Sequence, residues 1–388
     1  MRSSLLTAAA TLSILTLAAC GSNDAGDDAR ETPRPTARAD TNGADAMASR
    51  DPGSEPDPGM AQANNIPDPE DRPVMQAQVV LERLGFGPGV IDGKRGMSLS
   101  NAIAGFQESR DLPVTGELDE ATRQALAQWD DIAATRVVTV PQDWGDIAFS
   151  EVPEDAAQQA QMKRLGYEDM AEKLAERFHT TPEVLAALNP GGRPAGSPAS
   201  ADAPGESGPR YNPGQQLRVP NVGADRIVAS EVDNKDWLET LRSLGVGTDQ
   251  PEVARILVDE SEGWLKAYDR DDRLVALYTV TTGSRNDPLP VGDWQVTGVA
   301  YNPPFAYDPD LFWDVPDSAE DLQLPPGPNG PVGVVWIDLT KEHYGIHGTP
   351  APETIGRAQS HGCVRLTNWD AARLAQMVSP ETQVVFRK

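Results

Sequence analysis

The spacing of apolar residues changes along this chain, and that change limits the folds it can form. Near the start, Val74, Ala77, Leu81 and Leu84 recur three or four residues apart, which places them on one face of a helix. After residue 252 the apolar residues instead form short alternating runs between Asp, Gly and Pro turns, as in half-buried strands. We therefore predict a multidomain protein with a small helical domain first and a mainly-β domain last.

Residues 73–129 predict three short helices joined by turn-rich loops. The first contains Leu81, the second contains Leu99 and Phe106, and the third contains Leu126. The unit resembles the three-helix peptidoglycan-binding domain of many cell-wall enzymes, although residues 94–97 depart from that family's pattern. The segments that carry the resemblance are 84–86, 91–93, 106–107 and 112–116. A helical spacer that binds nothing is the alternative.

Residues 161–222 predict a small α+β module. A helix at 171–178 is followed by a second helix at Pro182, which Thr181 can cap, and a Gly turn then leads into a short strand ending at Pro220. This order resembles a LysM carbohydrate-binding module in which residues 165–167 replace the opening strand. We expect the module either to bind glycan or only to pack against its neighbours.

Residues 252–388 predict a mainly-β domain of sandwich or barrel-like form. Its short apolar or alternating runs are 256–259, 265–268, 274–280, 294–299, 334–339 and 384–386. One helix is expected at 371–378. Thr367 or Asn368 would cap it, Asp370 would sit favourably in its first turn, and Ser379-Pro380 would end it.

The first 72 residues predict export and a tether. Arg2, an apolar run at 5–17 and a small-residue cleavage site before Cys20 are typical of a signal peptide over residues 1–19. The Leu-Ala-Ala-Cys ending resembles a lipoprotein signal, which implies lipidation of Cys20, a membrane anchor and a periplasmic or cell-envelope location. An ordinary secretory peptide is the alternative. Residues 20–72 hold almost no large apolar side chain, so we expect a disordered tether.

The charge balance excludes one class of partner. The chain has 59 acidic and 33 basic residues, a formal net charge of −26 at pH 7. Binding to nucleic acid requires Lys and Arg residues that neutralise phosphates, and no basic stripe is present in the sequence. We therefore expect no nucleic-acid partner.

The candidate chemistry gathers around one thiol. The chain contains two cysteines, and lipidation of Cys20 would leave Cys363 without a disulfide partner. Three histidines, His343, His347 and His361, lie near Cys363 in the sequence. A thiol with an imidazole nearby is the minimum equipment for covalent acyl transfer, so we interpret Cys363 as a nucleophile.

The residues around this thiol resemble the catalytic signature of the L,D-transpeptidases, the YkuD-like family. The matching segments are 346–349, 355–357 and 360–368, and 281–284, Pro288, Pro290 and Gly292 match upstream. The resemblance implies that Cys363 is the nucleophile and His347 the general base. The backbone carbonyl of Gly348 would orient the His347 ring.

Other residues of the segment receive supporting roles. Ser360 and His361 would shape the loop around the thiol, and the N–H groups of Gly362 and Cys363 are candidates for an oxyanion hole. Tyr344 and Arg365 are predicted to contact the substrate. Arg365 would either hold a substrate carboxylate or only brace the loop.

The resemblance also implies a reaction. Cys363 would attack the bond between the diamino acid and the terminal D-alanine of a peptidoglycan tetrapeptide stem, releasing D-alanine and leaving a thioester. A stem-peptide amine would resolve the thioester into a cross-link, a protein lysine would give an attached protein, and water would make the enzyme a carboxypeptidase. No cofactor or metal is implied, and carbapenem-type β-lactams are expected covalent inhibitors.

Residues 301–333 form a Pro/Gly-rich insertion that carries Phe305, Tyr307, Phe312 and Trp313. Loops of this length are commonly functional, so the insertion is either a lid over the substrate groove or a packed surface loop.

The sequence disfavours three other functions. In a zinc hydrolase His343 and His347 would have to bind the same ion. They are four residues apart, and on an extended strand this spacing separates them by roughly 13 Å. A serine D,D-transpeptidase needs Ser-x-x-Lys, which the chain lacks. In a non-catalytic wall-binding lipoprotein Cys363 would be a buried apolar filler that does not react with a carbapenem.

Overall fold

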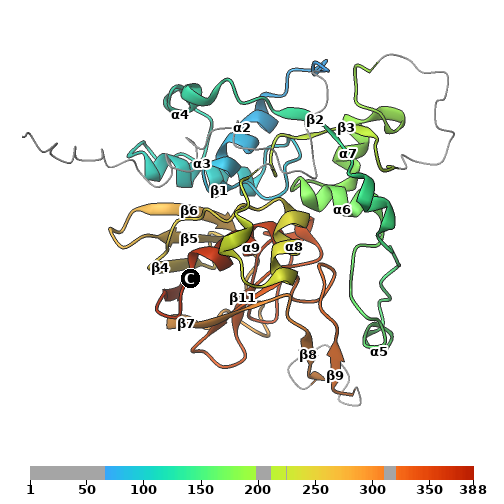
Figure 1. Ribbon diagram of the computed structural model, residues 1–388. Coiled ribbons are helices and arrows are strands. Elements are labelled where there is room, and N and C mark those ends of the chain that lie inside the picture. Colours follow the sequence, from blue (N-terminus) through green and yellow to red (C-terminus); the bar gives the residue numbers. More distant parts are fainter. Residues whose placement is uncertain (1–65, 198–210, 224, 310–319) are drawn as a thin grey trace, which may run out of the picture. The chain divides into compact units, whose positions relative to one another are not determined.

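Figure 1 presents a computed structural model that describes residues 66–197, 211–223, 225–309 and 320–388. The predicted signal peptide, Cys20, most of the tether, and Phe312 and Trp313 of the insertion lie outside the described residues. Within the described ranges, no helix combines the length and the apolar character needed to cross a bilayer. The tether was predicted to be disordered up to residue 72. This is wrong for its last residues, because the Ile66 carbonyl accepts a hydrogen bond from Arg218 at 2.9 Å and is thereby fixed to the second region.

The three helices predicted in the N-terminal region are present as α2 (Pro73–Arg83), α3 (Met97–Ser109) and α4 (Glu120–Leu126). Asp119 caps α4 by accepting a hydrogen bond from the Thr122 N–H. Phe86 and Phe106 are fully buried between the helices and meet edge to face with ring centroids 6.1 Å apart. The segment between α2 and α3 also contains β1 (Phe86–Gly87), which pairs with the large sheet described below.

The second region contains a two-stranded antiparallel sheet and two helices. β2 (Thr135–Thr139) pairs with β3 (Gln216–Pro220), and α6 (Met170–Arg177) and α7 (Pro182–Leu188) lie between them in the chain. The N-terminal limit predicted at 161 is wrong, because the strand that pairs with β3 begins at Thr135. Leu165 instead donates its N–H to the Pro326 carbonyl at 3.1 Å, so residues 165–167 contact the 301–333 insertion. A short helix, α5 (Ala156–Gln159), separates β2 from α6.

The C-terminal region is mainly β, as predicted. Among the described residues, nine strands form one sheet in the order β1-β6-β5-β4-β13-β7-β10-β11-β12. The bounds of its strands after β1 are β4 (Arg255–Asp259), β5 (Trp264–Tyr268), β6 (Leu274–Thr279), β7 (Gly292–Tyr301), β10 (Val335–Leu339), β11 (Gly345–His347), β12 (Val364–Arg365) and β13 (Gln383–Arg387). Thr281, just after β6, exchanges backbone hydrogen bonds with Arg365 of β12 at 3.1 and 2.8 Å, so the sheet bends back on itself.

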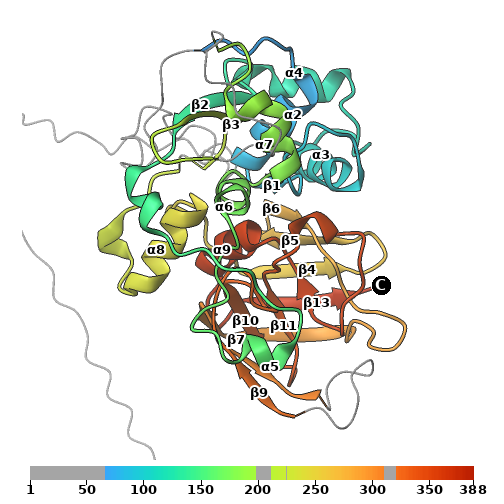
Figure 2. The ribbon, with the colours of Figure 1, turned by 90° about the vertical axis from the view of Figure 1, so that its right-hand side faces the viewer.

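Besides α3, which packs against β6, the helices α8 (Lys235–Leu244) and α9 (Asn368–Met377) contribute to the core of this sheet (Figure 2). α9 is the helix predicted near 371–378, and Thr367 caps it by accepting from the Asp370 N–H. α8 was not predicted. Three of its residues, Trp237, Leu241 and Leu244, belong to the same buried core as the sheet. The region that packs with the sheet therefore begins before residue 252, the predicted start of the mainly-β domain.

Within the insertion, β8 (Phe305–Tyr307) pairs with β9 (Leu322–Leu324). The lid interpretation of the insertion stays a prediction.

Candidate active site

His347 ends strand β11, and Cys363 directly precedes β12, the parallel strand that pairs with β11. Ile346 of β11 pairs with Val364 of β12, and His347 pairs with Arg365. Ile346 and Val364 are fully buried in the core. Because successive strand residues point to opposite faces, His347 and Arg365 lie on the other face of the sheet. Cys363 directly precedes β12, and the Arg365 charge acts to lower the pKa of both His347 and Cys363, so the guanidinium lies near both groups.

The His347 ring is held from two sides. Its Nδ1 lies 2.7 Å from the Gly348 carbonyl oxygen, and the Trp336 ring stacks on it with centroids 5.4 Å apart. Burial, followed by the nearby Arg365 charge, lowers the pKa of His347 to about 3, and the hydrogen bond to Gly348 only partly opposes this shift. The ring is therefore neutral at pH 7. With Nδ1 as the donor to a carbonyl, Nε2 carries the lone pair.

Cys363 is a free thiol that is partly exposed. Burial raises the pKa of the thiol, while the Gly345 backbone and Arg365 act in the opposite direction. Its Sγ lies 3.9 Å from the His343 carbonyl oxygen. Both pKa shifts favour the uncharged forms of these groups, a thiol at Cys363 and a neutral imidazole at His347.

The loop before Cys363 is fixed by Ser360 and Gly362. Ser360 is buried, donates its N–H to the Gly283 carbonyl at 3.1 Å, and donates its hydroxyl to the Cys363 carbonyl at 2.7 Å. Gly362 has a φ of 94°, and a Cβ there would meet the Tyr344 ring at 2.4 Å. Tyr344 thus packs directly on the loop that carries the thiol, and burial raises its pKa. His361, the remaining predicted member of this loop, is partly buried.

His343 lies differently from the prediction. β11 begins only at Gly345, and His343 lies before it in a turn with a φ of 65°. The prediction that His343 and His347 share one extended strand is therefore wrong. The His343 side chain is 60% exposed, with its Nε2 3.6 Å from Glu342.

One residue beside the imidazole was missed by the sequence analysis. Trp336 of β10 pairs with His347 across the antiparallel β10/β11 register. Its place opposite the histidine depends on strand pairing, which the local pattern of residues 334–339 does not specify.

Away from the thiol, three buried groups have the spacing of metal ligands. Potential ligand atoms of Glu82, His179 and Asp370 all lie within 4.8 Å of one another. Arg373 donates to Glu82 Oε1 at 2.8 Å, so a buried guanidinium already supplies positive charge at this place. We interpret the group as an ion network.

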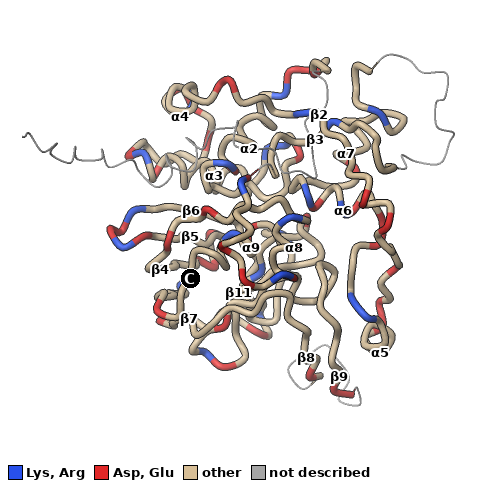
Figure 3. Tube along the Cα trace, in the orientation of Figure 1, with Lys and Arg blue, Asp and Glu red and all other residues tan. Residues whose placement is uncertain are grey.

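Over the described chain as a whole, Figure 3 shows Lys and Arg residues dispersed among Asp and Glu.

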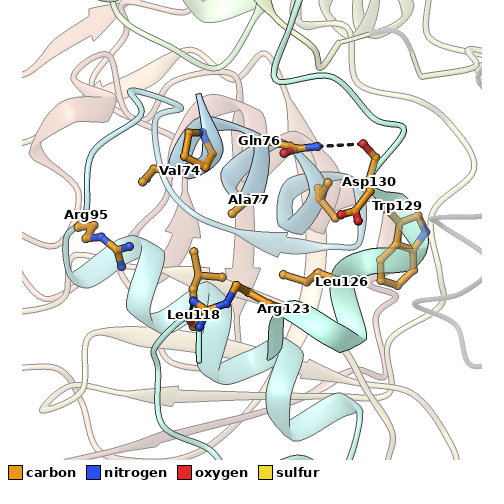
Figure 4. A pocket seen from close by; sticks show the side chains of 11 residues that line it. Val74, Gln76, Ala77, Arg95, Leu118, Arg123, Leu126, Trp129 and Asp130 are labelled. Carbon is orange, nitrogen blue, oxygen red and sulfur yellow. Dashed lines mark hydrogen bonds between the residues drawn. The ribbon is translucent and has the colours of Figure 1, made fainter. Parts of the chain in front are cut away.

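The helical region contains a cavity of about 350 Å³ (Figure 4). Val74 and Ala77 from α2 line one side, and Leu118, Leu126 and Trp129 line another. Two guanidinium groups, those of Arg95 and Arg123, also border it. The cavity therefore combines apolar side chains with two basic groups and the acidic Asp130, and Arg95 comes from the 94–97 segment that departs from the family pattern.

Comparisons with known proteins give two family matches. Residues 254–386 match the L,D-transpeptidase catalytic domain (YkuD). Residues 70–126 match a domain described as a putative peptidoglycan binding domain.

Curated relatives carry the same family name. The chain is 28% identical over 213 residues to the "Putative L,D-transpeptidase YkuD" of Bacillus licheniformis, covering 55% of this chain and 90% of that protein. It is 30% identical over 122 residues to the "Putative L,D-transpeptidase YqjB" of Bacillus subtilis, covering 30% of this chain and 61% of that protein.

Solved structures include the catalytic domain of an E. faecium L,D-transpeptidase, with 19% identity, a TM-score of 0.27, and coverage of 36% of this chain and 100% of that one. L,D-transpeptidase 3 from Mycobacterium tuberculosis with a faropenem-derived adduct has 18% identity and a TM-score of 0.29, covering 36% of this chain and 61% of that one. TM-scores at this level do not establish a shared fold. The sequence matches thus support similarity of residues 254–386 to the YkuD L,D-transpeptidase catalytic domain and of residues 70–126 to the peptidoglycan-binding domain.

Proposed function

We propose that this protein is a cysteine-dependent L,D-transpeptidase that acts on peptidoglycan tetrapeptide stems. The observation that supports the proposal is Arg365, which pairs with His347 in the β11/β12 register, follows Cys363 by two residues, and acts on the pKa of both groups. A nucleophilic thiol needs a neighbouring group that can accept its proton, and a neutral imidazole with a free Nε2 is such a group.

In the acylation step, His347 Nε2 takes the thiol proton as Cys363 Sγ attacks the carbonyl carbon of the stem's diamino acid. The N–H groups of Gly362 and Cys363 stabilise the oxyanion. As the tetrahedral intermediate collapses, the C–N bond to D-alanine breaks, and the imidazolium returns its proton to the leaving amine. A thioester on Cys363 and free D-alanine are the products.

Arg365 also takes part in the acylation step, because its charge affects the basicity of His347. Its charge lowers the pKa of His347, so a substrate carboxylate that pairs with the guanidinium would raise the basicity of the imidazole. Binding of the substrate would then prepare the proton transfer. In this scheme Tyr344, packed on Gly362, borders the bound stem.

In the second step an acceptor amine attacks the thioester and passes a proton to His347, and Cys363 leaves as a thiolate that takes this proton back. A stem diamino acid as acceptor gives a cross-link. A protein lysine would attach a protein, and water would give carboxypeptidase activity. The three outcomes share the acyl-enzyme and differ only in the acceptor.

The remaining modules are assigned roles in wall binding. Arg95 and Arg123 at the cavity of the helical domain suit stem-peptide carboxylates, and Trp129 suits an apolar or sugar face. Co-sedimentation with insoluble peptidoglycan tests this, because an Arg95→Gln/Arg123→Gln variant should bind less and unchanged binding would contradict the role.

The β2/β3 pair with α6 and α7 supports a LysM-like module that starts at β2.

Lipidation of Cys20 and a cell-envelope location also remain proposals. Mass spectrometry of the mature N-terminus tests the lipid, since an unmodified N-terminus would contradict it.

The experiment for the whole proposal is mass spectrometry of purified tetrapeptide muropeptides after incubation with the protein. Loss of D-alanine together with dimers linked through two diamino acids is expected, and the Cys363→Ala variant should give neither. Tripeptides without dimers would indicate the carboxypeptidase. Unchanged tetrapeptides would contradict the proposed function.

A further inference from the structure

Asn368 packs on the backbone that orients the candidate base. It is the first residue of α9 and is 1% exposed. A Cβ added at Gly348 would meet Asn368 Oδ1 at 2.2 Å, and one added at Gly333 would meet it at 1.8 Å. The same oxygen accepts a hydrogen bond from the Val334 N–H at 3.1 Å. The Asn368 side chain therefore packs against Gly348, whose carbonyl oxygen accepts a hydrogen bond from the His347 ring.

The other end of that amide is held by a residue far away in the sequence. Asn368 Nδ2 donates to Glu176 Oε1 at 2.6 Å and to the Pro328 carbonyl at 3.1 Å. Glu176 lies near the end of α6 in the second module. Its other carboxylate oxygen accepts a hydrogen bond from the Tyr167 hydroxyl. The carboxylate is thus itself fixed, so it can set the orientation of the amide.

We propose that Glu176 and Asn368 are positioning residues for the reaction: Glu176 orients the Asn368 amide, which holds the Gly348 backbone and through its carbonyl the His347 ring. This inference rests on the proposed function. It gives the second module a part in the chemistry besides any binding to glycan. Neither residue touches the thiol, so the effect passes through backbone geometry, where displacements of about 1 Å can lower a rate by as much as a hundredfold.

The same helix supplies a matched control. Glu172, one turn earlier on α6, accepts a hydrogen bond from Asn329 Nδ2 at 2.7 Å. It therefore also joins the second module to the insertion of the catalytic region, but through a residue other than Asn368. If Glu176 only helped to dock the module, removing Glu172 would have a similar effect.

The test compares Glu176→Ala, Glu176→Gln and Glu172→Ala in the full chain. The first readout is the limiting rate of Cys363 acylation by a carbapenem, separated from its half-saturation concentration. Glu176→Ala should lower the limiting rate by about tenfold or more with little change in half-saturation. Glu176→Gln keeps an amide oxygen for Asn368 Nδ2 and should restore most of the rate, and Glu172→Ala should behave like the natural protein.

The second readout is the Nδ1–H signal of His347 in NMR spectra of protein labelled with ¹⁵N-histidine. The chain has four histidines, so His347→Ala assigns the signal. Glu176→Ala should shift or broaden it, and Glu172→Ala should not. If Glu176→Ala fails to fold, Asn368→Asp replaces the amide donor with a carboxylate oxygen, which also carries negative charge beside Glu176, and should show the same loss.

Two results would overturn the inference. One is an equal loss of rate in Glu176→Ala and Glu172→Ala, and the other is an unchanged His347 signal in a folded Glu176→Ala protein. If the natural protein is not acylated at all, the proposed function fails instead. The NMR comparison still decides whether Glu176 positions the ring.

Discussion

Arg373 offers the sharpest test of how the ion network contributes to stability. Its side chain is 2% exposed, and its Nη1 donates to Glu82 Oε1 at 2.8 Å and to the Glu82 carbonyl at 2.7 Å. Glu82 is fully buried, and its Oε2 lies 3.2 Å from His179 Nδ1. The perturbation is Arg373→Met, which keeps much of the side-chain volume and removes the guanidinium.

The expected cost follows from what is left behind. Removing one partner of a buried ion pair typically destabilises a protein by about 3–5 kcal/mol, because the other charge stays buried without compensation. Here Glu82 keeps His179, and methionine leaves only a small cavity, so we expect about 3 kcal/mol. The double variant Arg373→Met/Glu82→Gln should cost about 1–3 kcal/mol less than the sum of its single changes, since no carboxylate is stranded.

Urea unfolding followed by tryptophan fluorescence and by far-UV circular dichroism provides the free energies. Trp369 stacks on His179 with ring centroids 5.1 Å apart, so its fluorescence reports on the network. Arg242→Met, at an exposed position on α8, is the control and should change stability by less than about 0.5 kcal/mol. Two results would contradict a stabilising role of the Arg373–Glu82 ion pair. One is a loss of less than about 1 kcal/mol in the free energy of unfolding for Arg373→Met, and the other is a double variant whose loss equals the sum of the two single losses.

Three further predictions concern proton chemistry. His347→Ala should abolish acylation of Cys363, and His361→Ala should weaken it while leaving some; stopped-flow acylation kinetics would contradict this if both variants kept the natural rate. Because burial raises the pKa of the Cys363 thiol, its alkylation by iodoacetamide should keep accelerating as the pH rises above neutrality, and a rate already at its plateau at pH 6 would instead indicate a preformed ion pair. Burial raises the pKa of Glu176 to about 7 from 4.5, so the folded state binds its proton more tightly than the unfolded state, and the free energy of unfolding should fall as the pH rises from 4.5 to 7. Glu176→Gln should flatten that part of the stability profile, and an unchanged slope in urea titrations would count against the shift.

Local signals predicted much of this structure. The cap at Thr367, the alternating runs and the three helical stretches before residue 129 each depend on a few neighbouring residues, and all appear in the structure. α8 carried a readable signal that was missed: Asn234 caps it, apolar residues recur at helical spacing, and Gly245 ends it with a φ of 75°.

Other features depend on contacts between distant segments. β2 pairs with β3 across about eighty residues of chain, so nothing near residue 135 marks it as the opening strand of the second module. The motif around Cys363 predicts roles for Cys363 and His347 from neighbouring residues alone, whereas the positions of Trp336, Asn368 and Glu176 depend on strand pairing and on packing between modules. His343 shows the opposite error, because a strand was extended backwards over a turn.

Intact-protein mass spectrometry after incubation with a carbapenem is the sharpest test of Cys363 as the nucleophile. The natural protein should gain the mass of one carbapenem molecule, peptide mapping should place the adduct on Cys363, and Cys363→Ala should gain nothing. An unmodified natural protein, or an adduct that persists in folded Cys363→Ala, would contradict this role.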